Sequence, residues 1–276
     1  MLRGFLKIDG RFVHLRRMGR GPALVLLHGS PNSSLSLVPL MEAMSARFNC
    51  IALDTPGNGL SDPLREDNPS TEDYAAALGL AVDALGLRRF SLYGFHTGAG
   101  TAAAYAGAHP ERVASMVLDG CAVWTESEKR SMLSGYLPTF RPDPMGAHLA
   151  WLWSRIAEQT MFFPWHRPSA ETRMDYDMPA PDILHRTAME FLSTGDHYRK
   201  PYAAALAGDG AARVRKLATR TLITAHPLDP IAHHLDRLEG YRSEVLVLRE
   251  TRLDRDAVWR GFASFLSETP GDAAPG

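Results

Sequence analysis

The sequence predicts an α/β protein, with a mostly parallel central sheet flanked by helices and a helical cap insertion. Two observations predict this fold class. Short apolar, β-rich runs alternate with helical patterns in the first half of the chain, and Gly or Pro marks most junctions. After Gly120 this rhythm stops, and it returns only at Thr219. We therefore expect one core formed by residues 1–120 and 212–276, and a helical cap formed by residues 121–211.

Each element follows from a local pattern. Asp9-Gly10 is a hairpin dipeptide, and Thr71 is a suitable helix cap. Residues 23–27 are continuously apolar, as expected for a strand buried on both faces. The predicted strands are 2–8, 11–17, 23–27, 49–54, 90–95, 113–119, 219–225 and 244–248. The predicted helices are 34–47, 71–85, 97–109, 146–160, 181–193, 199–208 and 254–267, with one more after residue 225.

Composition and charge exclude several classes of protein. The 276 residues include 30 Lys+Arg and 31 Asp+Glu, which gives a formal net charge of −1. Nucleic acid and anionic membranes bind basic surfaces, so this balance argues against both as the main partner. No apolar run reaches the roughly 18–20 residues of a membrane-spanning helix, and the N-terminus has no signal-peptide pattern. Cys50 and Cys121 are too few for a disulfide framework. We expect a cytoplasmic protein that acts on a small-molecule substrate and has no nucleic acid or membrane partner. Residues 269–276 should form a frayed tail. The sequence leaves open whether the protein forms a homodimer.

Four motifs follow predicted strands, where open α/β sheets place their ligands. They are His28-Gly29-Ser30-Pro31, Asp54-Thr55-Pro56-Gly57-Asn58-Gly59-Leu60-Ser61-Asp62, Gly94-Phe95-His96-Thr97-Gly98 and Asp229-Pro230. In this order, over nearly the whole chain, these motifs resemble those of the α/β-hydrolase superfamily. The resemblance implies that residues 121–211 are the cap domain, and that His96 stands at the apex of the strand-to-helix turn called the nucleophile elbow.

The chain departs from that superfamily at two places. His96 occupies the elbow position where relatives usually have Ser, Asp or Cys, and no histidine follows His234. Relatives place the histidine of their catalytic triad in the loop after the last strand, which here runs from Arg249 to Arg255. The usual nucleophile, acid and histidine therefore cannot be assembled in their usual places. Thr97 does not replace the nucleophile, because it falls one position too late.

A dinucleotide-phosphate site at Gly94, Gly98 and Gly100 is the competing interpretation of the glycine-rich turn. The spacing is Gly-x-x-x-Gly-x-Gly rather than Gly-x-Gly-x-x-Gly, and no acidic residue follows at the distance that ribose requires. Nor does the chain contain a His-Glu-x-x-His pattern for zinc. We therefore expect no cofactor and find no sequence signal for a metal.

The position of His96 suits acid–base chemistry. The partial positive charge at the start of the following helix should hold the imidazole neutral near pH 7, and a neutral imidazole is a suitable general base. Direct nucleophilic attack is the second option. By the resemblance, the backbone N–H groups of Ser30 and Thr97 form an oxyanion hole. The acid that orients His96 is either Asp229, at the usual acid position, or Asp119, at the end of a strand.

Three residues are further candidates for substrate contact: His28, Trp165 and His197. The resemblance also gives His28 a structural role in the oxyanion turn. Some of the cap's aromatic side chains should line an apolar, ring-accepting pocket against the sheet. We expect His233 and His234 to be solvated surface residues.

Three functions remain open. The leading one is a cofactor-independent hydrolase of an ester, a lactone or a related carbonyl compound that is small and apolar or aromatic, with His96 activating water. The second is a lyase, cyclase or isomerase in which His96 removes a carbon-bound proton. The third is a non-catalytic small-molecule binder that kept the fold.

The substitution His96→Ser is expected not to create ordinary esterase activity. A serine at the elbow needs a histidine to accept its proton, and no histidine is available in the expected loop. Cleavage of p-nitrophenyl esters measures this directly. Robust cleavage by the variant would show that another histidine occupies the base position.

Overall fold

The computed structural model describes residues 1–268 and contains an eight-stranded sheet of order β1-β2-β4-β3-β5-β6-β7-β8. The pairs β1–β2 and β2–β4 are antiparallel, and all other neighbours are parallel. The predicted mostly parallel sheet is therefore confirmed, while the expectation for residues 269–276 lies outside the described residues. The strands are β1 (Leu2–Ile8), β2 (Arg11–Met18), β3 (Ala23–Leu27), β4 (Asn49–Leu53), β5 (Phe90–Phe95), β6 (Val113–Asp119), β7 (Thr221–Ala225) and β8 (Val245–Arg249).

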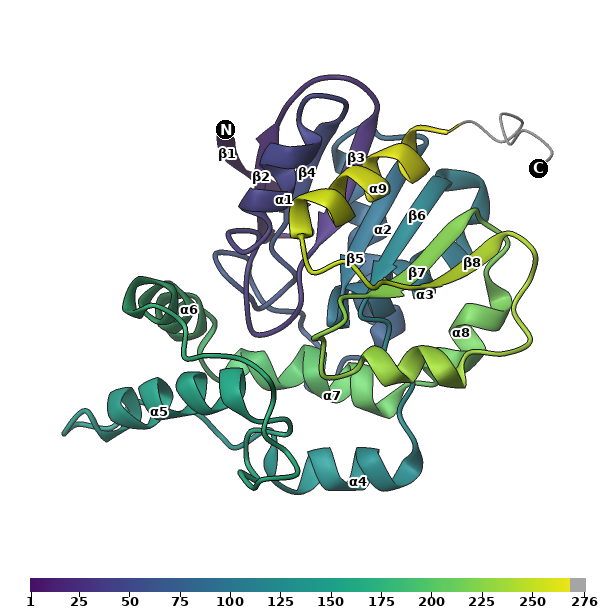
Figure 1. Cartoon of the computed structure of the whole chain (residues 1–276). Helices are drawn as coiled ribbons and strands as arrows, with labels where there is room; N and C mark the ends of the chain where they lie inside the picture. Colours follow the sequence, from purple (N-terminus) through teal and green to yellow (C-terminus); the bar gives the residue numbers. More distant parts are fainter. Residues whose placement is uncertain (269–276) are drawn as a thin grey trace.

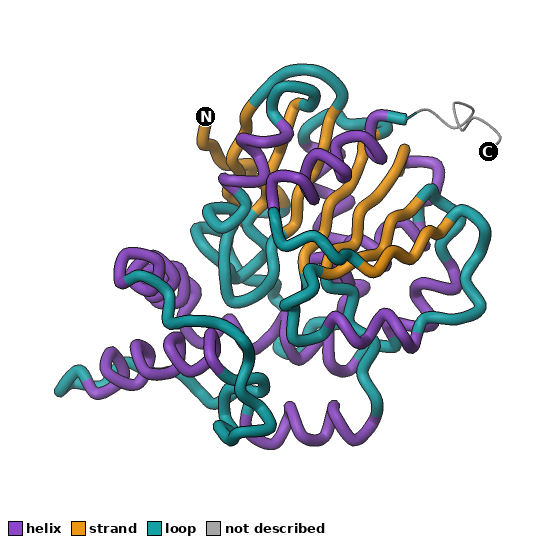
Figure 2. The backbone as a smooth tube through the Cα atoms, viewed as in Figure 1, coloured by secondary structure: helices purple, strands orange, loops and turns teal. Residues whose placement is uncertain are grey.

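Helices cover both faces of this sheet (Figures 1 and 2). Leu24 and Leu26 of β3 pack in one hydrophobic cluster with α1 and α9, and Val25 and Leu27 pack in another with α2, α3 and α8. Burial on both faces explains why this strand is apolar at every position. The helices are α1 (Val38–Met44), α2 (Thr71–Ala84), α3 (Thr97–Ala108), α8 (Gly210–Lys216) and α9 (Arg255–Ser267).

The chain between β6 and β7 adds no strand to the sheet and forms five helices. Four of them lie beyond the carboxyl ends of the parallel strands (Figure 1), whereas α8 packs against α3. They enclose two small cores of their own, one around Phe191 and one around Tyr136. No helix within residues 1–268 combines the length and the apolar character that crossing a bilayer requires. The four helices are α4 (Glu126–Gly135), α5 (Ala147–Met161), α6 (Pro181–Thr194) and α7 (Arg199–Ala207).

Two predicted helix starts are wrong in detail. Ser70, rather than Thr71, caps α2: its side chain accepts the N–H of Asp73, and the Asp73 carboxylate accepts the N–H of Ser70 in return. This reciprocal pair satisfies two backbone donors that the start of a helix leaves free. The first helix, α1, is shorter than the predicted range 34–47, because turns occupy the residues before it.

Helices α4 and α8 were not predicted from the sequence. Helix α4 begins with a capping box, in which the side chains of Thr125 and Glu128 each accept the other residue's backbone N–H. Asp209 caps α8 by accepting the N–H of Ala212. Cap residues would therefore have predicted two helices, α4 and α8, that hydrophobic periodicity missed.

The helix expected after residue 225 is only a short 3-10 helix, Ala232–Arg237.

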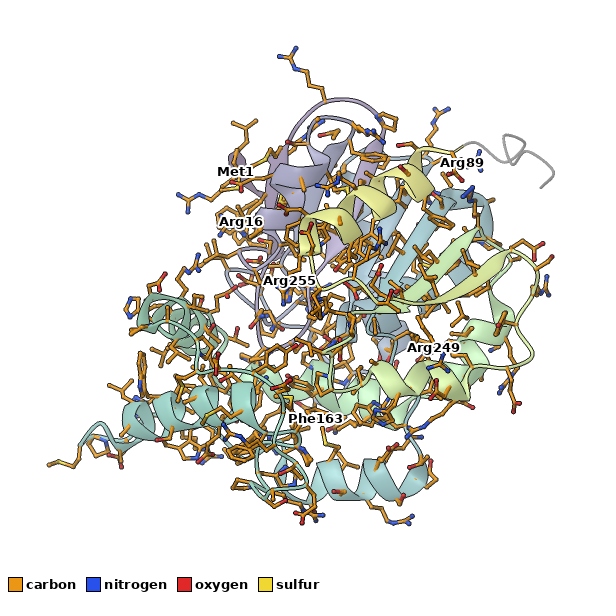
Figure 3. The ribbon with its side chains drawn as sticks, viewed as in Figure 1. Met1, Arg16, Arg89, Phe163, Arg249 and Arg255 are labelled. Atoms are coloured by element: carbon orange, nitrogen blue, oxygen red, sulfur yellow. The ribbon has the colours of Figure 1, made fainter. Side chains whose placement is uncertain are left out.

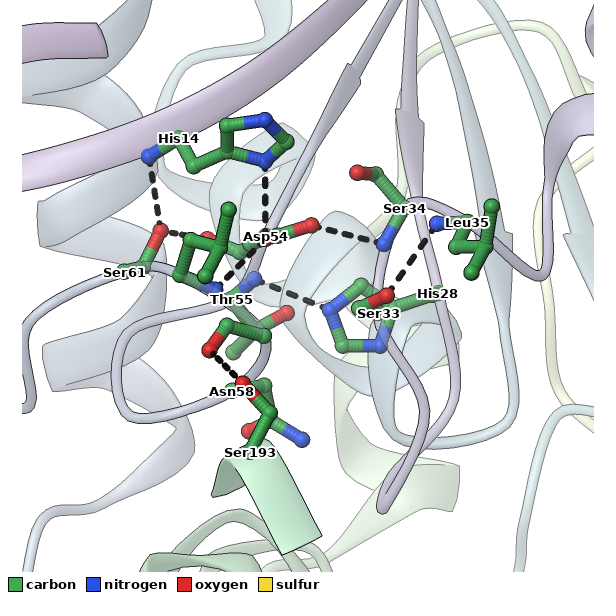
Figure 4. A network of polar contacts seen from close by, with 12 residues as sticks. His14, His28, Ser33, Ser34, Leu35, Asp54, Thr55, Asn58, Ser61 and Ser193 are labelled. Atoms are coloured by element: carbon green, nitrogen blue, oxygen red, sulfur yellow. Dashed lines mark hydrogen bonds and ion pairs between the residues drawn. The ribbon is translucent and has the colours of Figure 1, made fainter. Parts of the chain in front are cut away.

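The carboxylate of Asp54 anchors the loops at the carboxyl ends of β3 and β4 (Figure 4). It bonds His14 Nδ1 at 2.9 Å and accepts backbone N–H groups from Ser34 at 2.7 Å and Leu60 at 2.9 Å. Burial would raise the pKa of Asp54, but the hydrogen bonds from these groups lower it to about 2. The carboxylate is therefore ionised, and it ties the loop that follows β3 to β2 and β4.

Candidate active site

The turn from β5 into α3 places His96 in a strained backbone conformation, with φ 48° and ψ −109°. Glycines make this turn feasible. A Cβ on Gly94 would lie 2.5 Å from the Gly98 carbonyl oxygen, and a Cβ on Gly98 would lie 2.5 Å from the Leu27 carbonyl oxygen. The His96 N–H donates to the Asp119 carbonyl oxygen at 3.0 Å. The helix can therefore start directly against the strands, with the His96 side chain projecting from the apex.

The His96 ring contacts the carboxylate of Asp229, in the loop after β7. The distance from His96 Nε2 to Asp229 Oδ2 is 2.7 Å, and the Asp229 side chain is only 5% exposed. The other carboxylate oxygen accepts the N–H of Ile231 at 2.9 Å. A carboxylate only accepts hydrogen bonds, so His96 Nε2 carries a proton and donates it. Of the two acids left open by the sequence, Asp229 is the one that contacts the ring.

The other ring nitrogen, His96 Nδ1, lies on the edge that faces away from Gly120. A Cβ on Gly120 would lie 2.3 Å from His96 Cδ2, which places the Cδ2 edge against that backbone. Within residues 1–268, Nδ1 has no hydrogen-bond partner, and the His96 side chain is 31% exposed. The Phe95 ring stacks on the imidazole with a centroid distance of 4.0 Å. Nδ1 is therefore the nitrogen that gains or loses a proton.

Two cavities meet at His96. The first has a volume of about 190 Å³ and an aromatic wall from the insertion, and the second has a volume of about 530 Å³ and carries more charged groups. The expected ring-accepting pocket between insertion and sheet is therefore present. Figure 3 labels one residue of each wall, Phe163 and Arg255. The first cavity is lined by Ser30, Thr97, Trp124, Tyr136, Phe163 and Tyr202, and the second by Tyr93, Asp119, Tyr176, Asp229 and Arg255.

The electrostatics of His96 differ from the prediction. Burial lowers the pKa of His96, but the charge and hydrogen bond of Asp229 and the charge of Asp119 outweigh this and raise it above its ordinary value. The helix N-terminus therefore does not lower the pKa of His96 as expected, because the two carboxyl groups dominate. For Asp229, burial raises the pKa, while the charge and hydrogen bond of His96 and the N–H of Ile231 bring it below its ordinary value. Each partner therefore favours the charged form of the other.

Asp119 lies in the second cavity but does not hydrogen-bond to the His96 ring. Its Oδ2 accepts the hydroxyl of Tyr93 at 2.8 Å. Burial raises the pKa of Asp119 to about 6, the hydrogen bond from Tyr93 opposes this rise, and the charge of Asp229 adds to it. Asp119 therefore keeps its proton up to about pH 6, and once it is ionised it acts on His96 only through its charge.

The predicted oxyanion donors lie side by side, but one of them is occupied. The Ser30 N–H donates to Thr97 Oγ1 at 2.9 Å, and the Thr97 hydroxyl donates to Ser30 Oγ at 3.2 Å. The Thr97 N–H is at the first position of α3, where a backbone donor has no partner inside the helix. Both donors are therefore present at the elbow, but the Ser30 N–H is occupied by the Thr97 side chain in this structure. Among residues 1–268, the Thr97 hydroxyl hydrogen-bonds only to Ser30 and has no base as a partner.

None of the three predicted substrate contacts lines the two cavities at His96. His28 is fully buried: its Nε2 accepts the N–H of Thr55 at 2.9 Å, and its Nδ1 lies 3.0 Å from the Gly29 carbonyl oxygen (Figure 4). Burial lowers the pKa of His28, so it is a neutral structural residue. Trp165 is buried inside the insertion, and His197 lines a different cavity.

One cluster within residues 1–268 has the residue types of a metal site: Glu128, His233 and His234. His234 Nδ1 accepts the N–H of Val123 at 3.0 Å, so the proton of the neutral ring is on Nε2, which then cannot bind a metal. Glu128 is held by two short hydrogen bonds from Arg237, at 2.6 and 2.7 Å. The cluster therefore does not fit a metal. His234 is fully buried, which corrects the expectation that it is solvated.

Part of the chain is similar in sequence to known proteins. A family model described as alpha/beta hydrolase fold matches residues 22–164. Haloalkane dehalogenase 2 of Mycobacterium bovis is 32% identical over 112 residues, covering 41% of this chain and 39% of that protein. The 2-hydroxy-6-oxononadienedioate/2-hydroxy-6-oxononatrienedioate hydrolase 2 of Pseudomonas putida is 35% identical over 116 residues, covering 39% and 40%. The chain thus spans about two fifths of the length of these curated relatives.

A likeness in three dimensions extends over nearly the whole chain. The crystal structure of a hydrolase from Pseudomonas aeruginosa PA01 superimposes with a TM-score of 0.73 at 18% sequence identity. The match covers 96% of this chain and 98% of that one. At this level of identity the likeness concerns the fold, and it includes the sheet, the helices and the insertion.

The substitution Asp119→Asn is expected to stabilise the protein at pH 7. The pKa of Asp119 is raised to about 6, so the folded protein holds this proton more tightly than the unfolded chain, and stability is lost as pH rises through that value. Asparagine avoids this loss and still accepts the Tyr93 hydroxyl. Urea unfolding should show a gain of up to about 3 kcal/mol at pH 7.

The control for this experiment is Asp67→Asn, which changes an exposed carboxylate and should leave stability unchanged. The advantage of Asp119→Asn should vanish below about pH 4, where both states hold the proton. A variant that is less stable than the wild type at pH 7 would contradict this account of Asp119.

Proposed function

The chain belongs to the α/β-hydrolase fold family, and we propose that it is a cofactor-independent hydrolase in which His96 Nδ1 is the general base. The substrate class is an ester, a lactone or a related small carbonyl compound. The observation that carries the proposal is the 2.7 Å contact between His96 Nε2 and Asp229 Oδ2. This contact leaves Nδ1 without a partner within residues 1–268, on a ring that lines both cavities.

The arrangement merges two positions of the usual triad. In a standard triad an acid orients one nitrogen of a histidine, and the other nitrogen takes the proton of a separate nucleophile. Here the imidazole itself projects from the elbow and reaches Asp229 directly, with Nε2 on the acid and Nδ1 free. No side chain is left at the apex to act as a separate nucleophile, so the attacking group is a water molecule.

The reaction then has two proton transfers. Nδ1 takes a proton from water as its oxygen bonds to the substrate carbonyl carbon, and the Asp229 carboxylate stabilises the imidazolium that forms. The tetrahedral intermediate breaks its bond to the leaving group, which receives the proton from Nδ1. The products are a carboxylic acid and an alcohol, and His96 returns to its neutral form.

Negative charge on the carbonyl oxygen is stabilised at the start of α3. We assign the Thr97 N–H as one donor and the Ser30 N–H as the second, after the substrate oxygen displaces Thr97 Oγ1 from its 2.9 Å contact with the Ser30 N–H. The positive end of the α3 dipole adds to this stabilisation. Two of the similar proteins named above are hydrolases by name, which supports hydrolysis over proton abstraction from carbon.

The experiment that tests this function is hydrolysis in ¹⁸O-labelled water, after a panel of small esters and lactones has identified a substrate. The proposal predicts one labelled oxygen in the acid product, and a loss of at least about 10² to 10⁴ in rate for His96→Ala. Circular dichroism should show that the variant keeps the fold, although its Tm should fall because the buried Asp229 carboxylate loses its partner. Unlabelled product would indicate lyase or isomerase chemistry, and unchanged turnover of His96→Ala would remove this residue from the mechanism.

The substitution Asp229→Asn is expected to shift the pH profile. Nδ1 acts only when unprotonated, so kcat/KM should rise with pH through the raised pKa of His96. Removing the Asp229 charge leaves burial opposed only by the charge of Asp119, so the acid limb should move to lower pH, with a lower plateau. Asp119→Asn should move the limb in the same direction by less. An acid limb that stays in place in Asp229→Asn would contradict the pairing.

A further inference from the structure

A buried arginine in the insertion has no acidic partner. Arg155 of α5 is 1% exposed, and its Nη1 donates to Gln159 Oε1 at 2.7 Å. Its Nε and Nη2 atoms are buried without a hydrogen-bond partner, and within residues 1–268 no carboxylate lies at ion-pair distance from the guanidinium. A charge in this position is costly, because water has been removed and nothing of opposite sign replaces it.

An aromatic cage around Arg155 offsets only part of this cost. The guanidinium carbon lies 4.9 Å from the ring centre of Trp165, 4.8 Å from that of Phe191 and 5.4 Å from that of Tyr198. Cation–π contacts of this kind are weaker than the hydration that a cation loses when it is buried. The cage therefore holds the guanidinium in place and leaves its charge uncompensated.

This charge acts on the first cavity. Gln159, which binds Arg155, lines the cavity together with Tyr136 and Tyr202. Burial raises the pKa of Tyr136 and of Tyr202, and the Arg155 charge opposes that rise at both. Arg213 lines the same cavity but differs, because its guanidinium bonds Glu72 at 2.9 and 3.0 Å. The cavity wall therefore has an uncompensated positive charge directly behind it.

We propose that the substrate of this site carries a carboxylate, which lies on the insertion side of the first cavity and is the missing counter-charge of Arg155. This inference rests on the proposed function and specifies its substrate class. The Gln159 oxygen accepts from Arg155, and the Gln159 amide N–H groups are on the side of Tyr202, a second residue of the cavity wall. We infer that these N–H groups transmit the Arg155 charge to the ligand. Arg155 is thus a positioning residue that acts through Gln159, and the scissile carbonyl lies toward His96.

The test compares charged and neutral ligands of one shape. Binding of glutarate and of glutaramide is measured by titration calorimetry at pH 7, so that it does not depend on turnover. A second arm measures kcat/KM for monomethyl glutarate and methyl valerate. The variants are Arg155→Met, which removes the charge, and Arg155→Lys, which retains it. The matched control is Arg186→Met, which removes an arginine from the second cavity only.

The wild type is expected to prefer the anion by about tenfold or more in both arms. Arg155→Met should bring the ratio close to one by weakening the binding and turnover of the anions, while Arg155→Lys retains much of the preference and Arg186→Met retains all of it. Thermal unfolding of Arg155→Met should not weaken, because a buried unpaired charge is lost.

A wild-type ratio near one overturns the proposal without any variant, and so does a ratio lost in Arg186→Met rather than Arg155→Met. Anion binding without any ester turnover would refute the hydrolase function and leave the carboxylate site standing. Ester turnover without anion preference would refute the carboxylate site and leave the hydrolase function standing.

Discussion

The close packing of α3 against β3 and β5 is the constraint on which the site depends. The backbone of Gly98 lies so near the Leu27 carbonyl that a side chain cannot fit, and Gly94 is held in the same way against the helix. The chain must therefore turn within one residue, and that residue takes a positive φ with its side chain projecting outward. The position of His96, its approach to Asp229 and its exposure to both cavities all follow from this turn.

A single imidazole then separates two cavities with different charges in their walls. The second cavity carries the carboxyl groups of Asp119 and Asp229 and the guanidinium of Arg255, so both signs of charge are present there. The first cavity has the uncompensated charge of Arg155 behind its wall. Asp229 and Asp119 raise the pKa of His96 and so make it a stronger base.

The sequence predicted the elements that repeat a simple pattern and missed those set by distant contacts. Apolar runs located the strands to within two residues at each end, and the glycines around His96 located the turn. Asp229 stayed one of two candidate acids, because 133 positions separate it from His96 and only the fold brings them together. The Thr97 hydroxyl over Ser30 and the burial of His234 depend on loop packing, for which no local pattern exists.

The protonation of the two His96 nitrogens is the most direct measure of the central claim. Long-range ¹H–¹⁵N correlation spectra, recorded across pH with His96→Ala for assignment, report the state of each nitrogen separately. The account predicts that Nε2 keeps its proton throughout and that Nδ1 titrates with a pKa above the ordinary value of about 6.5. A ring that carries its proton on Nδ1 at high pH, or that titrates below that value, would contradict it.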